Sequence, residues 1–146
     1  MKINESKTKV MIFNQATSVD FFPQVKMDGE NLIEVVEQMK LMGIIIRSDM
    51  KWCSNTKNLV AKCYQRMWML RNLKRNGADQ IQLIKTYNQQ VRSIAEMACP
   101  VWNAGITIHE INSIERVQKT ALAIILGRSY TTYSEALEAL NIDALE

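Results

Sequence analysis

The sequence contains few of the residues that build catalytic or metal sites. One histidine, His109, and three cysteines, Cys53, Cys63 and Cys99, occur in 146 residues, and no two cysteines form a C-x-x-C pair. Zinc sites and disulfide frameworks need clustered or regularly spaced Cys and His residues. We therefore expect free, mostly buried thiols and a solvent-exposed His109 at the start of a helix, with neither a zinc site nor a disulfide framework.

Long apolar runs and familiar catalytic motifs are also missing. The longest apolar stretch, residues 41–46, is interrupted by Gly43 and is far shorter than the ~20 residues that span a membrane. The first five residues turn charged at once and lack the apolar core of a secretory signal. No Walker, G-x-G-x-x-G or G-x-S-x-G pattern occurs. We expect an intracellular protein, cytoplasmic or nuclear, with no membrane partner.

Acidic residues are scarce in the middle of the chain, although the whole sequence carries only +3. Residues 1–50 carry a net −1 and residues 96–146 a net −4. Residues 51–95 have nine Lys or Arg against the single acid Asp79, a net +8. A basic centre between neutral and acidic ends predicts a polyanionic partner for the middle of the chain.

Aromatic residues alternate with the basic ones in this central region. Tyr64 and Trp68 lie four residues apart in a stretch that contains no acid from Lys57 to Arg75. Basic side chains can neutralise phosphates, and aromatic rings can pack on sugars or bases. The candidate nucleic-acid-binding residues are Lys57, Lys62, Tyr64, Arg66, Trp68, Arg71, Lys74, Arg75, Lys85 and Arg92. The alternative interpretation is a solvated helix face whose Trp68 packs against another helix.

The first third of the chain has the alternation and β-branched content of strands. Asp28-Gly29 predicts a tight hairpin turn, because both central residues of such a turn adopt positive φ. Gly43 lies inside an Ile-rich segment, where we expect a bulge or a close backbone approach. The expected strands are Lys7–Phe13, Phe21–Met27, Asn31–Val36 and Met39–Arg47.

After Trp52 the apolar period changes to 3.6 residues, which indicates helices. Capping residues and glycines suggest their limits. We expect helices over Asn55–Asn76, from Asp79 to Pro100, from Thr107 to Gly127, and over Ala136–Leu140 with Thr132 and Glu135 as caps. The sequence thus predicts an α+β fold, with a small antiparallel sheet or hairpin over residues ~6–47 followed by three or four helices. The expected domains are residues 1–50 and 51–146.

Several segments, taken in chain order, carry a family resemblance. They are residues 4–11 (NESKTKVM), 40–46 (KLMGIII), 48–52 (SDMKW), 66–71 (RMWMLR), 87–102 (YNQQVRSIAEMACPVW) and 115–121 (ERVQKTA). The set resembles the later part of the polymerase domain of non-LTR (LINE-type) retrotransposon reverse transcriptases. Residues 40–46 are similar to its K-Y-L-G-V-x-I primer-grip segment, and residues 87–102 to its Y-x-x-x-V-R-S-x-x-x-Y-A-x-P-V-W segment.

The resemblance implies a palm-end hairpin followed by a thumb-like helical bundle that holds an RNA–DNA or DNA duplex. It implies a primer-grip-like role for Leu41, Met42, Gly43 and Ile44, and at most a vestigial role for Lys7, which matches the family's motif D lysine. Met42 stands where the family usually has Leu, a mild departure. The family's Y-A-D-D aspartates are absent from this chain. A divalent metal such as Mg²⁺ is therefore implied only for the complete enzyme, and the chain alone should be inactive.

Two alternatives remain open from the sequence. The helices could form a protein–protein interaction module, with Phe21, Phe22 and Met27 on an exposed apolar surface. The chain could also be a relic of a retrotransposon without function. Because it ends at Glu146 directly after an apolar helix, we expect a truncated copy or a piece of a split gene, whose missing palm and fingers could be supplied by another chain.

Overall fold

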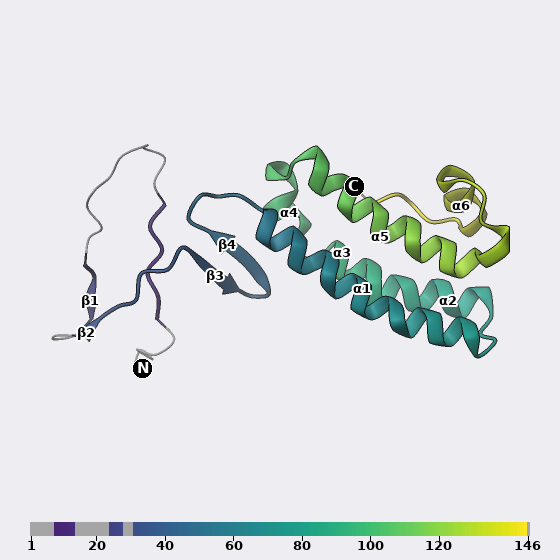
Figure 1. The fold of residues 1–146 in the computed structure, drawn as a ribbon, viewed down its shortest axis with the longest axis horizontal. Coiled ribbons are helices and arrows are strands. Elements are labelled where there is room, and N and C mark those ends of the chain that lie inside the picture. The colour runs from purple at the N-terminus through teal and green to yellow at the C-terminus, as the bar shows by residue number, and fades with distance from the viewer. Residues whose placement is uncertain (1–7, 14–23, 28–30, 146) are drawn as a thin grey trace. The chain divides into compact units, whose positions relative to one another are not determined.

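A computed structural model describes residues 8–13, 24–27 and 31–145 of the chain (Figure 1). The chain divides into two compact units, Met1–Asn55 and Thr56–Glu146. The strands belong to the first unit, and the helices, apart from the first turn of α1, belong to the second. The α+β fold predicted from the sequence is therefore confirmed.

The first hairpin pairs β1 (Lys26–Met27) with β2 (Asn31–Leu32) in antiparallel register. This pairing confirms the expected hairpin, although Asp28-Gly29 itself lies outside the described residues. The paired strands are much shorter than predicted. The described part of the expected strand Lys7–Phe13 makes one parallel bridge, from Val10 to Val35, and Lys7 lies outside the described residues.

The second hairpin corrects one prediction. Met39–Arg47 was expected to be a single strand, and this is wrong: β3 (Gln38–Leu41) pairs antiparallel with β4 (Ile44–Arg47). Met42 and Gly43 have φ values of 48° and 92°. Positive φ at both central residues identifies a two-residue turn of type I′, whose twist matches that of the flanking strands. Gly43 is therefore a turn residue, where its freedom at positive φ is needed, and not a bulge.

The connection from β4 to α1 (Cys53–Arg75) is held by side chains. Asn55, which is 3% exposed, accepts a hydrogen bond from the backbone N–H of Ile45 at 3.1 Å. Asp49 accepts two bonds from the Arg47 guanidinium, at 2.9 and 2.8 Å, and one from the backbone N–H of Lys51 at 3.1 Å. These hydrogen bonds, that of Arg47 first, lower the pKa of Asp49 to about 2.

Helix α1 ends as its sequence predicts. Gly77 has a φ of 80°. The N–H of Ala78 bonds the carbonyl of Leu73 at 3.0 Å, and the N–H of Gly77 bonds that of Lys74 at 3.2 Å. This pair of bonds is the Schellman arrangement, which satisfies carbonyls that the last helical turn leaves free.

The next helical segment begins as expected and ends earlier than expected. Asp79 caps α2 (Gln80–Tyr87) by accepting a bond from the N–H of Gln82 at 2.7 Å. A π-helical turn, η2 (Asn88–Arg92), and a last short turn, α3 (Ser93–Ala95), follow. The prediction that Pro100 ends this helix is wrong, because the chain turns at Ala98 with a φ of 53°.

Pro100 instead lies in the first turn of α4 (Cys99–Trp102). A first helical turn accepts proline without loss, because its N–H groups have no partner within the helix. A 3-10 turn, η3 (Asn103–Gly105), then leads to the long helix α5.

Helix α5 (Ile108–Leu126) has the expected capping box. Glu110 accepts a bond from the backbone N–H of Thr107 at 2.7 Å, and the Thr107 hydroxyl accepts one from the N–H of Glu110 at 3.4 Å. After η4 (Gly127–Ser129), Thr132 caps α6 (Tyr133–Leu140), which starts three residues earlier than predicted. Both predicted start signals are therefore confirmed.

Each of the two long helices contributes one buried stripe to the core of the helical unit. In α1 the buried side chains are Leu59, Cys63, Met67 and Leu70, and in α5 they are Ile114, Val117, Gln118, Ala121, Leu122 and Ile125. Both sets follow the 3.6-residue period predicted from the sequence, whereas Ile111, near the start of α5, is 40% exposed. Helices α1 and α5 run in the same direction, and their C-terminal ends meet (Figure 1).

Candidate nucleic-acid interface

Five predicted site residues fall on one exposed face of α1. An α-helix turns 100° and rises 1.5 Å per residue. Residues 57, 64, 68, 71 and 75 therefore lie within a sector of roughly 60° over a length of about 27 Å. We call this set the α1 stripe: Lys57, Tyr64, Trp68, Arg71 and Arg75. All five side chains are exposed.

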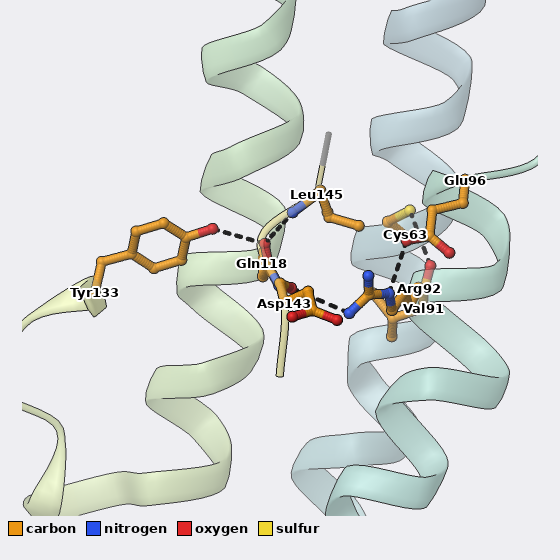
Figure 2. Close-up of polar contacts among 8 residues, drawn as sticks. All are labelled: Cys63, Val91, Arg92, Glu96, Gln118, Tyr133, Asp143 and Leu145. Carbon is orange, nitrogen blue, oxygen red and sulfur yellow. Dashed lines mark hydrogen bonds and ion pairs between the residues drawn. The ribbon is translucent and has the colours of Figure 1, made fainter. Parts of the chain in front are cut away.

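The buried face of α1 lies about 100° around the helix from the stripe. Cys63, Met67 and Leu70 are fully buried. The Cys63 thiol also donates to the carbonyl oxygen of Val91 in η2, with a sulfur–oxygen distance of 3.7 Å (Figure 2). These residues pack α1 against the rest of the bundle, and the stripe lies on the part of the helix surface that stays exposed.

The cations of the stripe are not neutralised within the part of the chain that the structure describes. Helix α1 itself contains no acidic residue. The ion pairs found across the described ranges are Lys9–Glu34, Arg47–Asp49, Arg92–Glu96 and Lys119–Glu115. None of them uses a residue of α1, so the stripe remains a surface of positive charge that can bind an anion.

The aromatic side chains of the stripe are exposed to solvent, whereas Trp102 is buried in the core. Trp68 is 66% exposed and Tyr64 is 39% exposed. Trp102 is only 2% exposed, and its indole N–H donates to the carbonyl oxygen of Met97 at 2.9 Å. A buried indole normally finds such a partner. The alternative that Trp68 packs against another helix of this unit is therefore not what the structure shows.

Three other predicted cations lie apart from the stripe. Lys62 and Arg66 are displaced from its centre by about 140° and 180° around α1. Arg66 is exposed and Lys62 is half-buried. Lys85 is exposed on α2. One common role was predicted for all of these basic residues, and the structure separates these three from the aromatic pair.

Two further predicted site residues form hydrogen bonds with other parts of the helical unit. The Lys74 ammonium donates to the carbonyl oxygen of Ile125, in the last turn of α5, at 2.8 Å. Arg92 donates to the Glu96 carboxylate at 2.7 Å and to the carbonyl oxygen of Asp143 at 3.1 Å (Figure 2). Both cations therefore hold distant segments of the helical unit together.

Sequence reasoning missed Gln118, which secures the same C-terminal segment. Its side chain is fully buried, and its amide nitrogen donates to the carbonyl oxygen of Asp143 at 2.8 Å. Its amide oxygen accepts from the Tyr133 hydroxyl at 2.7 Å and from the backbone N–H of Leu145 at 2.9 Å (Figure 2). The signal was a polar residue inside the apolar stripe of α5, since a polar residue in such a position needs internal partners.

The primer-grip-like residues differ in exposure: two are exposed to solvent, one is half-buried and one is buried. Met42, at the tip of the second hairpin, is 93% exposed, and Leu41 is 51% exposed. Gly43 is half-buried, and Ile44 is only 8% exposed. The turn therefore presents Leu41 and Met42 outward, while Ile44 anchors β4.

The cysteines are free, as predicted. Burial raises the pKa of the Cys63 thiol to about 11, and it also raises the pKa of Cys99. A nucleophilic cysteine needs the opposite shift, because the thiolate is the reactive form. His109 is exposed at the start of α5, as expected.

Within the described residues, no three His, Cys, Asp or Glu side chains gather in an arrangement that could hold a metal ion. The helices in the described ranges include none with the length and hydropathy needed to cross a membrane. No protein-family model, curated protein or solved structure matches this chain.

Proposed function

We propose that this chain binds nucleic acid through the α1 stripe, as a fragment similar to the duplex-holding part of a reverse transcriptase. One observation carries the proposal: three cations and two aromatic rings, without partners among the residues that the structure describes, share one exposed face of a helix that contains no acid. The expected partner is an RNA–DNA or DNA duplex. The chain has no catalytic role by itself, because it lacks the aspartates that hold the catalytic metal ions in the family it resembles.

The charge arrangement suits binding to a phosphate backbone without reading of sequence. Contacts to phosphates position a protein on a duplex, whereas contacts to base edges specify sequence. The stripe extends for about 27 Å, and DNA carries one phosphate per ~3.4 Å of each strand. Lys57 at one end, with Arg71 and Arg75 at the other, can therefore reach phosphates several nucleotides apart.

A second candidate is a helical protein–protein interaction module. It is favoured by exposed apolar side chains around the start of α5: Val101 is 58%, Ile108 78% and Ile111 40% exposed. Phe21 and Phe22, which are predicted to lie on such a surface, are outside the described residues. The two candidates use different faces, so one set of variants separates them.

The decisive experiment measures binding of the purified chain to a labelled RNA–DNA hybrid across a salt series. We expect log K to fall linearly with log salt, with a slope of about −3 for three neutralised phosphates. The double variant Lys57→Glu/Arg71→Glu should bind at least about tenfold more weakly and flatten the slope by about two.

The matched control is Lys62→Glu/Arg66→Glu, which changes the net charge equally on the same helix but away from the stripe. We expect it to weaken binding far less than the stripe double variant does. Equal losses in the two double variants would show that net charge alone drives binding, without a defined face. No binding at low salt would overturn the proposal in favour of the interaction module.

A further inference from the structure

We propose that Tyr64 and Trp68 form a stacking site for unpaired bases, so that the chain prefers a duplex with a single-stranded overhang to a blunt duplex. The inference rests on the proposed nucleic-acid binding and defines its substrate more closely. It starts from the position of the two rings at the centre of the α1 stripe, with Lys57 on one side and Arg71 and Arg75 on the other.

The rings are available for a ligand. Trp68 is 66% exposed and Tyr64 is 39% exposed, and neither side chain makes a hydrogen bond or ring contact to another residue in the described ranges. Since the two residues are one helical turn apart, their side chains are neighbours on the helix surface. Exposed aromatic faces beside cations form the kind of platform on which bases of single-stranded nucleic acid stack.

The spacing of the rings favours unpaired bases over paired ones. Residues four apart in an α-helix are separated by about 6 Å along the axis. Successive bases of a duplex strand rise only ~3.4 Å, and each inner base already has a neighbour on both faces. Two adjacent bases can therefore contact both rings only after they separate from each other, which unpaired nucleotides do at little cost.

The charges around the rings argue for a nucleic acid over a second copy of this chain. Two copies meeting through the stripe would bring three cations of each against three of the other, with no acid on either α1. Like charges placed face to face in this way cost free energy. A single strand supplies a negative charge at every nucleotide beside each base, so one ligand satisfies both the cations and the rings.

The test measures the affinity of the full chain for two labelled RNA–DNA hybrids. One hybrid is blunt, and the other has the same duplex extended by a short oligo-dT overhang. We expect the wild-type chain to bind the overhang hybrid at least about fivefold more tightly, because stacking on an aromatic ring contributes that much or more per base. Trp68→Leu should bring the ratio of the two affinities down to about one, and Trp68→Phe should keep part of the preference.

The charge variant Arg71→Ala provides the matched comparison, since it should weaken binding to both hybrids by the same factor. Equal affinity of the wild-type chain for the two hybrids would overturn the stacking site and leave the proposed function intact. A preference that survives Trp68→Leu would overturn it too. Absence of binding to either hybrid would overturn the proposed function as well. Because Trp68 is exposed, its variants should keep the unfolding midpoint of the wild-type chain, which circular dichroism can check.

Discussion

Helices α1 and α5 are the two long helices of one unit, yet they use their charges in opposite ways. In α5, Glu110 caps the first turn, and Glu115 pairs with Lys119 at 3.0 Å. The Lys119 ammonium also lies 4.8 Å from the centre of the Tyr133 ring. Helix α1 has six cations, and of these Lys74 alone has a hydrogen-bond partner in the described parts of the chain.

This difference separates polar groups that have partners within the described residues from those that have none there. Like charges three or four residues apart on a helix destabilise it by ~0.2–0.5 kcal/mol per pair. Arg71 forms such pairs with both Lys74 and Arg75. Folding alone would favour acids between these cations, as α5 places Glu115 beside Lys119. Variants of both helices can test whether the polar groups of α5 stabilise the fold while those of the α1 stripe do not.

The largest effect on stability is expected at Gln118 of α5. Gln118→Met keeps a side chain of similar length but removes the partner of the Tyr133 hydroxyl, the Asp143 carbonyl and the Leu145 N–H. Buried polar groups without partners cost ~1–3 kcal/mol each, and part of this cost is relieved by water. We expect the free energy of unfolding to fall by about 2–4 kcal/mol in urea titrations followed by circular dichroism.

The control for this variant is Gln65→Met, because Gln65 is exposed on α1. Its free energy of unfolding should change by less than about 0.5 kcal/mol. Similar losses in the two variants would mean that the Gln118 bonds do not stabilise the helical unit, and the contrast between the helices would then fail.

A smaller loss is expected at Lys74, the one α1 cation with an internal partner. Lys74→Met removes the bond to the Ile125 carbonyl while keeping most of the apolar stem. A hydrogen bond from a partly exposed cation should contribute about 1 kcal/mol. The neighbouring variant Arg75→Met alters the same helical turn without breaking a bond, so its free energy of unfolding should change by about 0.5 kcal/mol or less. If Arg75→Met proves as costly as Lys74→Met, the loss reflects the helix terminus and not the bond.

Local features of this fold could be predicted from the sequence, because neighbouring residues determine them. The caps at Asp79, Thr107 and Thr132 and the stop at Gly77 all depend on residues within five positions of each other. The turn at Met42-Gly43 was missed because methionine lacks the preference for positive φ that makes Asn-Gly a recognisable signal.

The division of the basic residues could not be predicted, because it depends on distant contacts. Lys74 reaches Ile125 and Arg92 reaches Asp143, in each case 51 residues away. Which cations remain free is therefore decided only when the helices pack. The π-helical turn at η2 precedes the early end of the second helix, and no feature of residues 88–92 indicated it. The sequence shows that α1 is rich in basic and aromatic residues. Which of its cations share an exposed face with Trp68 is known only once the buried side of the helix is known.

A still smaller effect is expected at Glu115. Glu115→Gln breaks the pair with Lys119 on a half-exposed surface. Pairs of this kind at a spacing of four contribute ~0.3–0.5 kcal/mol. The loss should appear in low-salt unfolding experiments and vanish at ~1 M salt, where the screening length is about 3 Å. A loss that persists at high salt would indicate that Glu115 stabilises α5 by some means other than charge.

The smallest effect on stability is expected from the α1 stripe, and there the contrast between the helices becomes sharpest. Lys57→Gln/Arg71→Gln removes two exposed cations that have no partner in the part of the chain described, and it relieves the repulsion of Arg71 by Lys74 and Arg75. The free energy of unfolding should stay within about 0.5 kcal/mol of the wild-type value, or rise slightly. The affinity for an RNA–DNA hybrid should nevertheless fall at least about tenfold at low salt. Stability lost in proportion to affinity would show that folding uses these cations too. Stability kept while affinity is lost would mean that α1 retains an uncompensated charge, at a small cost to the fold, for a partner that the chain does not contain.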